Sequence, residues 1–103
     1  MYRGTTPTFL FELDTAVDLS SMSQIWVTIR DGARIKHNWD ITRVTIDNEN
    51  HTIGLWLSQQ ETLEMHPGIG AAQIRFLTTG GSAFTTERTQ IYISPTLRGG
   101  VIS

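Results

Sequence analysis

The stretch Gln24-Ile25-Trp26-Val27-Thr28-Ile29-Arg30 places a β-branched apolar residue at every second position. Successive side chains leave a β-strand on opposite faces, so this pattern predicts a half-buried strand with Ile25, Val27 and Ile29 in the core. Trp26 then points outward. The same period of two recurs elsewhere, at Phe9, Phe11 and Leu13, at Ile53, Leu55 and Leu57, and at Ile91 and Ile93.

Turn signals divide the chain into seven such segments. The strands are expected at residues 8–13, 24–30, 34–39, 43–47, 52–57, 71–77 and 83–94, the last interrupted near 86–88. Asp31-Gly32 predicts a tight hairpin, because glycine tolerates the positive φ of such turns. Seven strands at this spacing predict one all-β domain over residues 1–103, an immunoglobulin-like β-sandwich of about seven antiparallel strands with one short helix.

The helix is predicted from Ser58-Gln59-Gln60-Glu61, which matches a capping box. In this motif the serine hydroxyl accepts from the Glu61 amide, and the Glu61 carboxylate reaches back to the start of the helix. The helix is expected to run to Met65 and to end before Pro67-Gly68. We expect it to cover one end of the sandwich, with His66 beside the free carbonyls of its last turn.

Composition excludes several classes of protein. The chain has 103 residues, no cysteine and a net charge of -2. It therefore has no disulfide framework, no thiolate zinc site and no cysteine nucleophile. The net charge gives no attraction to nucleic acid or to an anionic membrane, so neither is expected as a partner. Arg30, Arg34 and Lys36 cluster around one turn, which we interpret as a solvated hairpin tip.

The N-terminus lacks the apolar segment of a signal peptide, and no apolar run approaches the ~20 residues that cross a bilayer. Synthesis and folding in a cytoplasm are therefore expected.

No group of residues predicts catalysis. His37, His51 and His66 have no second ligand at a short metal-binding spacing, and no serine has a histidine at a recognised spacing. Glu61 and Glu64 lie one helical turn apart and are interpreted as solvated carboxylates. We therefore predict no catalytic residue, no metal, no cofactor and no enzymatic activity.

Two tryptophans are the main candidates for binding. Trp26 and Trp56 fall on the outward positions of their strands, whereas Trp39, in phase with Ile35, is expected in the core. In an immunoglobulin topology the strands of Trp26 and Trp56 are neighbours, so both indoles are expected on one outer face. Such a patch indicates a partner surface, cover by other parts of the chain, or a platform for sugar rings.

The C-terminal segment Leu97-Arg98-Gly99-Gly100-Val101-Ile102-Ser103 is the second candidate. Its apolar residues Leu97, Val101 and Ile102 flank a Gly-Gly pair. Residues 97–103 are expected to form a flexible tail, or to add a strand to the sheet edge of a neighbour.

Four segments carry a resemblance to a known group of proteins. They are Met1-Tyr2-Arg3-Gly4-Thr5-Thr6-Pro7-Thr8-Phe9, Val17-Asp18-Leu19 with Ile25-Trp26-Val27-Thr28, Leu57-Ser58-Gln59-Gln60-Glu61-Thr62-Leu63, and Leu97-Arg98-Gly99-Gly100-Val101-Ile102. Together they resemble small tail-gene products of phages and prophages of Gram-positive, often gut, bacteria. The chain is also similar to the N-terminal β-sandwich of upper baseplate proteins of siphophages, but it ends before their long helix and receptor-binding region.

This resemblance implies a structural or assembly role in a phage particle, with no active site to transfer. The expected function is therefore that of a phage tail or baseplate-associated structural protein, which forms oligomers or binds other tail proteins. Association with the virion follows as its expected location. The alternative is a carbohydrate-binding module that stacks sugars on Trp26 and Trp56.

Overall fold

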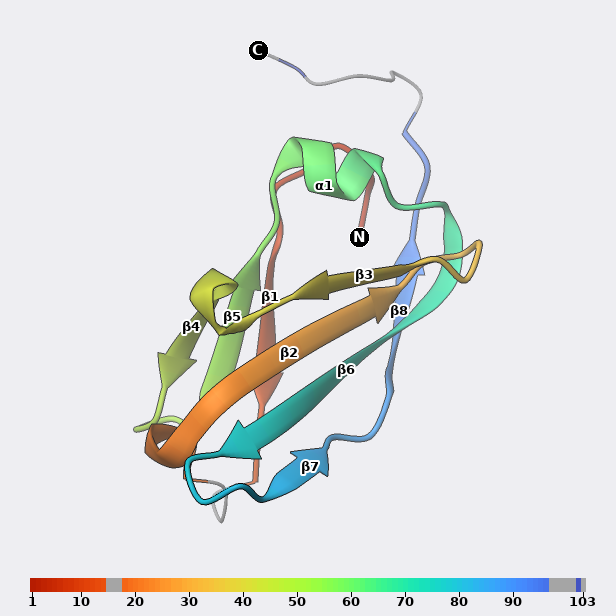
Figure 1. The fold of residues 1–103 in the computed structure, drawn as a ribbon. Helices are drawn as coiled ribbons and strands as arrows, with labels where there is room; N and C mark the ends of the chain where they lie inside the picture. The colour runs from red at the N-terminus through yellow and green to blue at the C-terminus, as the bar shows by residue number, and fades with distance from the viewer. Residues whose placement is uncertain (15–17, 97–101, 103) are drawn as a thin grey trace.

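The computed structural model describes residues 1–14, 18–96 and 102, and it consists of two antiparallel β-sheets packed face to face (Figure 1). The smaller sheet has the order β1 (Thr8–Glu12), β5 (Thr52–Trp56) and β4 (Val44–Asp47). The larger sheet has the order β3 (Lys36–Trp39), β2 (Met22–Arg30) and β6 (Gly68–Thr78), and both β7 (Ala83–Thr85) and β8 (Thr89–Ile93) pair with β6. The predicted all-β sandwich is confirmed.

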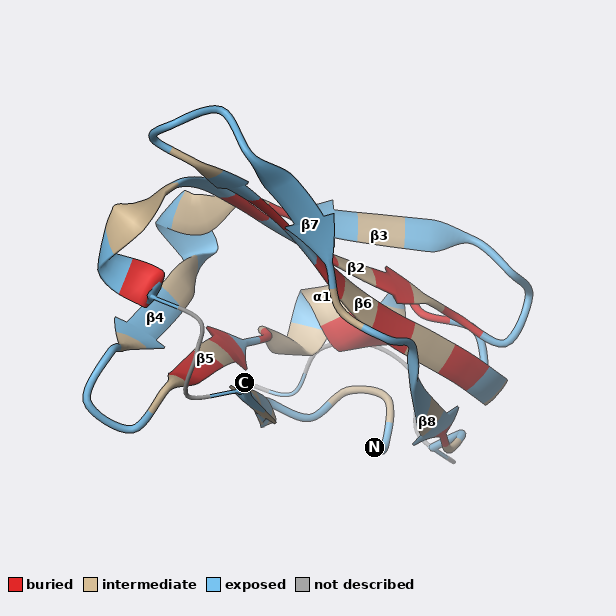
Figure 2. Ribbon diagram, turned by 90° about the horizontal axis from the view of Figure 1, so that it is seen from below, coloured by how far each residue is buried: buried red, intermediate tan, exposed pale blue. Residues whose placement is uncertain are grey.

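The core lies between the sheets, as the period of two predicts. Ile25, Val27 and Ile29 of β2 are fully buried and pack with Ile53 and Leu55 of β5 in one apolar cluster. Figure 2 shows the buried residues distributed along β2, β5 and β6 and in α1. Trp39 also belongs to this cluster, which confirms the prediction for its side chain.

The last predicted strand forms two strands, and the break falls at residues 86–88 as expected. Thr86 holds the break against β6, because its N–H donates to the Ile74 carbonyl at 2.9 Å and its hydroxyl accepts from the Ile74 amide at 3.0 Å. β7 and β8 therefore pair with successive parts of one edge of β6. This pairing extends β6 beyond the predicted residues 71–77.

One expected neighbour relation is wrong. β2 pairs with β3 along one edge and with β6 along the other, so β2 and β5 lie in different sheets. A strand has only two edges for backbone hydrogen bonds, and the β2–β3 hairpin and the long β2–β6 pairing occupy both. Trp26 and Trp56 consequently lie on opposite outer faces of the sandwich.

The turn between β2 and β3 also differs from the predicted two-residue hairpin. The positive φ falls on Arg34, at 65°, and not on Gly32. Gly32 is required for space, because a Cβ there would lie 1.9 Å from the carbonyl oxygen of Pro67. The wider turn leaves Ile35 outside β3 and 48% exposed, so Ile35 does not share the buried position of Trp39.

In the described part of the chain, three short helices complete the fold: η1 (Leu19–Ser21), η2 (Ile41–Arg43) and α1 (Gln59–Leu63). The capping box of α1 is confirmed, since Ser58 Oγ accepts from the Glu61 amide at 3.2 Å and the Ser58 amide donates to Glu61 Oε1 at 3.0 Å. The helix ends at Leu63, two residues before the predicted end. Met65 is nevertheless buried in the core, as expected for a segment that covers one end of the sandwich.

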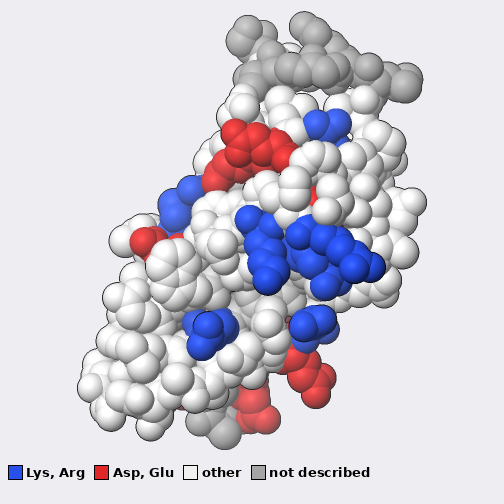
Figure 3. All heavy atoms as spheres, turned by 45° about the vertical axis from the view of Figure 1, so that its right-hand side comes forward, with Lys and Arg blue, Asp and Glu red and all other residues white. Residues whose placement is uncertain are grey.

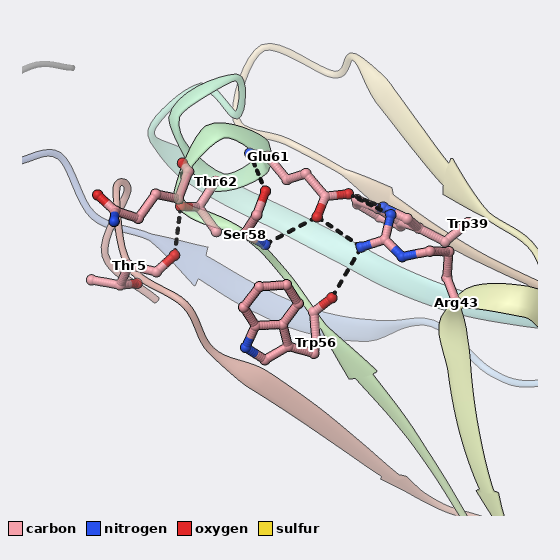
Figure 4. A network of polar contacts seen from close by, with 8 residues as sticks. Thr5, Trp39, Arg43, Trp56, Ser58, Glu61 and Thr62 are labelled. Atoms are coloured by element: carbon pink, nitrogen blue, oxygen red, sulfur yellow. Dashed lines mark hydrogen bonds and ion pairs between the residues drawn. The ribbon is translucent and has the colours of Figure 1, made fainter. Parts of the chain in front are cut away.

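Glu61 also links the two sheets (Figure 4). Its carboxylate accepts from Trp39 Nε1 at 2.6 Å and from both terminal nitrogens of Arg43, at 2.8 and 3.0 Å. Arg43 in turn donates to the carbonyl oxygen of Trp56 at 3.2 Å. Hydrogen bonds from Arg43, opposed by burial and assisted by Ser58 and Trp39, lower the pKa of Glu61 to about 2. Glu61 is thus a structural carboxylate and not a solvated one.

Close backbone approach at Gly70 leads to a first prediction. A Cβ at Gly70 would lie 2.1 Å from the Arg30 carbonyl oxygen, whereas a Cβ at Gly54 would meet nothing closer than 3.9 Å. Gly70→Ala is expected to lower the free energy of unfolding by about 3 kcal/mol, because β2 and β6 must separate locally. Gly54→Ala, the matched control, is expected to change it by less than about 0.5 kcal/mol. Urea unfolding compares the two variants, and equal losses would contradict this account of Gly70.

Glu61→Gln tests the link between the sheets. Because the folded-state pKa of Glu61 lies below its ordinary value of 4.5, the stability it contributes is complete above pH 4.5 and is lost as the pH falls toward about 2. The variant is expected to be less stable by about 2–3 kcal/mol at pH 7, and the difference from wild type should shrink on acidification. Urea unfolding across this pH range measures it. Glu64→Gln, at an exposed position, serves as the control, and a pH-independent difference would contradict the assignment.

Candidate functional site

The best candidate site is the outer surface of the larger sheet, here called the β2/β6 face. It is formed by the outward side chains of the central strands β2 and β6 and of the edge strand β3, together with Arg88: Gln24, Trp26, Thr28 and Arg30 of β2, Gln73, Arg75 and Leu77 of β6, and Lys36 and Asn38 of β3. All except Arg88 alternate with core residues, so the register of the sheet fixes their positions.

The strand register sets these side chains in rows. Trp26 lies opposite Arg75 across the β2–β6 pair. In the next row Thr28 lies between Asn38 and Gln73, and its hydroxyl donates to Asn38 Oδ1 at 2.6 Å. The third row places Arg30 beside Lys36. An indole, a polar row and two cations therefore follow one another along the sheet.

Two shallow hollows occupy this face. One, of about 470 Å³, is lined by Trp26, Leu77 and Ala83, and the other, of about 310 Å³, by Arg30, Lys36 and Arg88. Both include Thr28, Asn38 and Arg75, so they form one continuous surface. Trp26 is 45% exposed, which confirms that it points outward.

The face is also positively charged. Within the described part of the chain, no carboxylate forms an ion pair with the four cations of this face, Arg30, Lys36, Arg75 and Arg88. Figure 3 shows Lys and Arg side chains gathered over the middle of this side of the molecule, with Asp and Glu toward its margins. Of these four cations, sequence reasoning identified only Arg30 and Lys36 as neighbours and assigned them to a solvated turn. Arg75 joins them because β6 pairs with β2.

This combination of groups favours binding over catalysis. Tryptophan and arginine contribute large shares of the binding energy in protein interfaces, because both combine apolar area with hydrogen-bond donors. Cations without internal partners also attract acidic surfaces. The face therefore has the chemistry to dock an acidic macromolecular surface against Trp26.

Trp56, the second predicted binding residue, is 53% exposed on the smaller sheet. Its surroundings include Leu10, Gly54 and Thr45, around a hollow of about 350 Å³. Arg43 borders this hollow, but its guanidinium is bound to Glu61. The two tryptophans do not meet, so a sugar platform built from both within one subunit is not present.

The predicted C-terminal site falls mostly outside the described residues, which exclude Leu97 and Val101. Ile102 is described and its side chain is 62% exposed. Its backbone amide and carbonyl bind the side-chain amide of Gln59 at 2.9 and 3.0 Å. These contacts place Ile102 beside α1, away from the β2/β6 face.

A second polar cluster surrounds Asp31, whose side chain is 0% exposed. Asp31 Oδ1 accepts from the amides of Ala33 and Ile35, each at 3.0 Å. Asp31 Oδ2 contacts His37 Nε2 at 2.9 Å and His66 Nδ1 at 2.8 Å. Burial raises the pKa of Asp31, but the hydrogen bonds from His37, His66 and the backbone outweigh burial and hold that pKa well below its usual range.

The Asp31 cluster corrects the expectation for His66, which binds a carboxylate and not the end of α1. Sequence spacing gave no signal, because residues 31, 37 and 66 meet only when the β2–β3 turn packs beside Pro67. An Asp–His pair orients a general base in hydrolases, but no described serine or threonine hydroxyl bonds to His66. Among the described residues, no set of three or more side chains is arranged to hold a metal ion.

Comparison of this chain with protein-family models, with curated proteins and with solved structures gives no match. Within residues 1–14, 18–96 and 102, no helix has the length and apolar character needed to cross a membrane.

Asp31→Asn tests whether this cluster is structural. The amide replaces an acceptor by a donor that faces the donors of His66 and the turn, so the free energy of unfolding at pH 7 is expected to fall by about 3 kcal/mol. Asp40→Asn is the matched control, because Asp40 caps η2 from a half-buried position outside the core and asparagine caps equally well. Urea unfolding measures both variants. An Asp31→Asn protein as stable as wild type would contradict a structural role.

Proposed function

We propose that this chain is a structural protein associated with a phage or prophage tail, and that it acts through protein–protein contacts of the β2/β6 face. The resemblance of its sequence to tail-gene products supports the setting. The observation that carries the binding role is the exposed Trp26 beside cations that have no carboxylate partner in the described chain.

The scaffold under this face supports docking without rearrangement. β2 is paired along both edges, and β6 pairs with β2 on one side and with β7 and β8 on the other. The inward residues Ile25, Val27 and Ile74 are buried, which fixes the outward residues between them. A surface that is already ordered loses little conformational entropy when it binds.

The smaller sheet supports binding less well. Trp56 is exposed there, but the nearest cation of its hollow, Arg43, is bound to Glu61 within the same chain. No comparable group of unpaired cations surrounds Trp56 among the residues that line this hollow. We therefore assign the partner surface to Trp26 and not to both tryptophans.

Tail association leads to a direct test of this function. Particles purified after prophage induction in the strain that carries the gene are expected to contain this chain in a fixed ratio to the tail subunits, measured by mass spectrometry. Co-expression with the products of neighbouring tail genes is expected to yield a complex. Trp26→Ala should weaken that complex by about tenfold or more, whereas Trp56→Ala should leave it nearly unchanged.

Absence of the chain from intact particles would contradict tail association. A complex that loses affinity with Trp56→Ala but not with Trp26→Ala would contradict the assignment of the face. Circular dichroism of both variants controls for folding.

A further inference from the structure

Half of the carboxylates of this chain gather at one end of the molecule, away from the cations of the β2/β6 face. Opposite α1 in Figure 1, the end of β1 and the β4–β5 turn lie together with η1. The amide of Leu13 donates to the His51 carbonyl at 2.8 Å, and the amide of Leu19 donates to Asn48 Oδ1 at 3.0 Å. These bonds gather five of the ten carboxylates, here called the acidic end: Glu12, Asp14, Asp18, Asp47 and Glu49.

Two carboxylates of the acidic end are held by hydrogen bonds in their own turns. Hydrogen bonds from Ser20 lower the pKa of Asp18, and hydrogen bonds from Asn50 lower the pKa of Asp47. The same bonds fix both carboxylates in their turns. Ile46, the residue before Asp47 in β4, is 38% exposed at the free edge of the smaller sheet, but it pairs with the core residue Ile53 and points to the opposite side of the strand from Asp47.

We infer that the β2/β6 face binds the acidic end of a second copy of this chain, in a head-to-tail contact. This inference deepens the proposed function, on which it rests for the use of the face, by naming the partner. The four cations of the face meet the carboxylates of the acidic end, and Trp26 lies within the same contact.

Charge complementarity is the argument for a second copy. Within one copy the two surfaces cannot neutralise each other, since no ion pair joins them in the described residues. The molecule measures 46 × 27 × 19 Å, so an end of it is narrow enough to lie across a sheet face of the next copy. Opposite charges across such a contact steer the encounter and fix its register.

The contact joins two different surfaces, so a head-to-tail pair still has one free face and one free end. Association of this kind produces either a closed ring or an open filament. Repetitive assembly is what a tail component requires.

A nucleic acid is the less favoured partner for the same face. The net charge of the chain is -2, and the acidic end repels a long polyanion that extends beyond the face. One exposed indole also provides a single stacking position, whereas single-strand binding proteins stack successive bases.

Sedimentation velocity of the full chain tests the contact. At about 10 mM ionic strength, where charges act over about 30 Å, the sedimentation coefficient is expected to rise with concentration beyond that of a dimer. At about 1 M ionic strength, where that distance is about 3 Å, the chain is expected to be monomeric.

Reciprocal charge reversal gives the decisive comparison. One variant reverses the face, with Lys36→Glu and Arg75→Glu, and another reverses the end, with Glu12→Lys and Glu49→Lys. All four residues are exposed, and none has a side-chain hydrogen bond or ion pair in the described structure. Each variant alone is expected to lose association at least tenfold, and an equimolar mixture of the two is expected to regain it. Glu64→Lys, beside α1, is the control and should associate like wild type.

Several outcomes would overturn the inference. The first is that the wild-type chain stays monomeric up to about 1 mM at low salt. The second is that the charge-reversal variants associate like wild type. The third is that the mixture of variants does not regain association, although each variant keeps the wild-type circular dichroism spectrum. Binding of an oligothymidine strand by a monomeric wild-type chain would assign the face to nucleic acid instead. A monomeric chain found in tail particles overturns self-docking alone, whereas a self-associating chain absent from particles overturns the tail role alone.

Discussion

The antiparallel pairing of β2 with β6 is the constraint on which the rest of the structure depends. It runs from Met22 opposite Thr78 to Arg30 opposite Ala71, with one irregularity near Met22. Its inner side supplies a large part of the apolar core, and its outer side forms the β2/β6 face. A shift of one residue in this register would move Trp26 and Arg75 inward and expose the core residues, so burial and the binding surface are specified together.

Two carboxylates connect the strands to the turns and the helix around them. Asp31 joins the β2–β3 turn to the segment before β6 through His66, and Glu61 joins α1 to β3 and, through Arg43, to β5. Both carboxylates are surrounded by donors, which is the condition under which a buried charge stabilises a fold.

Much of the fold follows from local patterns. Alternation predicted which face of β2 is buried, the capping box predicted the start of α1, and Thr86 to Arg88 were expected to interrupt the last strand. The pairing partners of a strand are not encoded in its local sequence. The expectation that β2 lies beside β5, with both tryptophans on one face, was therefore wrong. The same limit applies to the site, because Arg75 and Arg88 join Arg30 only through pairing and packing across long sequence separations, and Asp31 meets His66 in the same way.

Trp26 fluorescence tests the central claim, that this pairing builds an exposed indole within a positive surface. In the Trp56→Phe variant, Trp26 is the exposed tryptophan and Trp39 stays buried. At equal ionic strength, and with each quenching constant divided by that for free N-acetyltryptophanamide, iodide is expected to quench the emission more strongly than caesium, because the cations of the face concentrate anions near the indole. Equal quenching by both ions, or stronger quenching by caesium, would contradict the account.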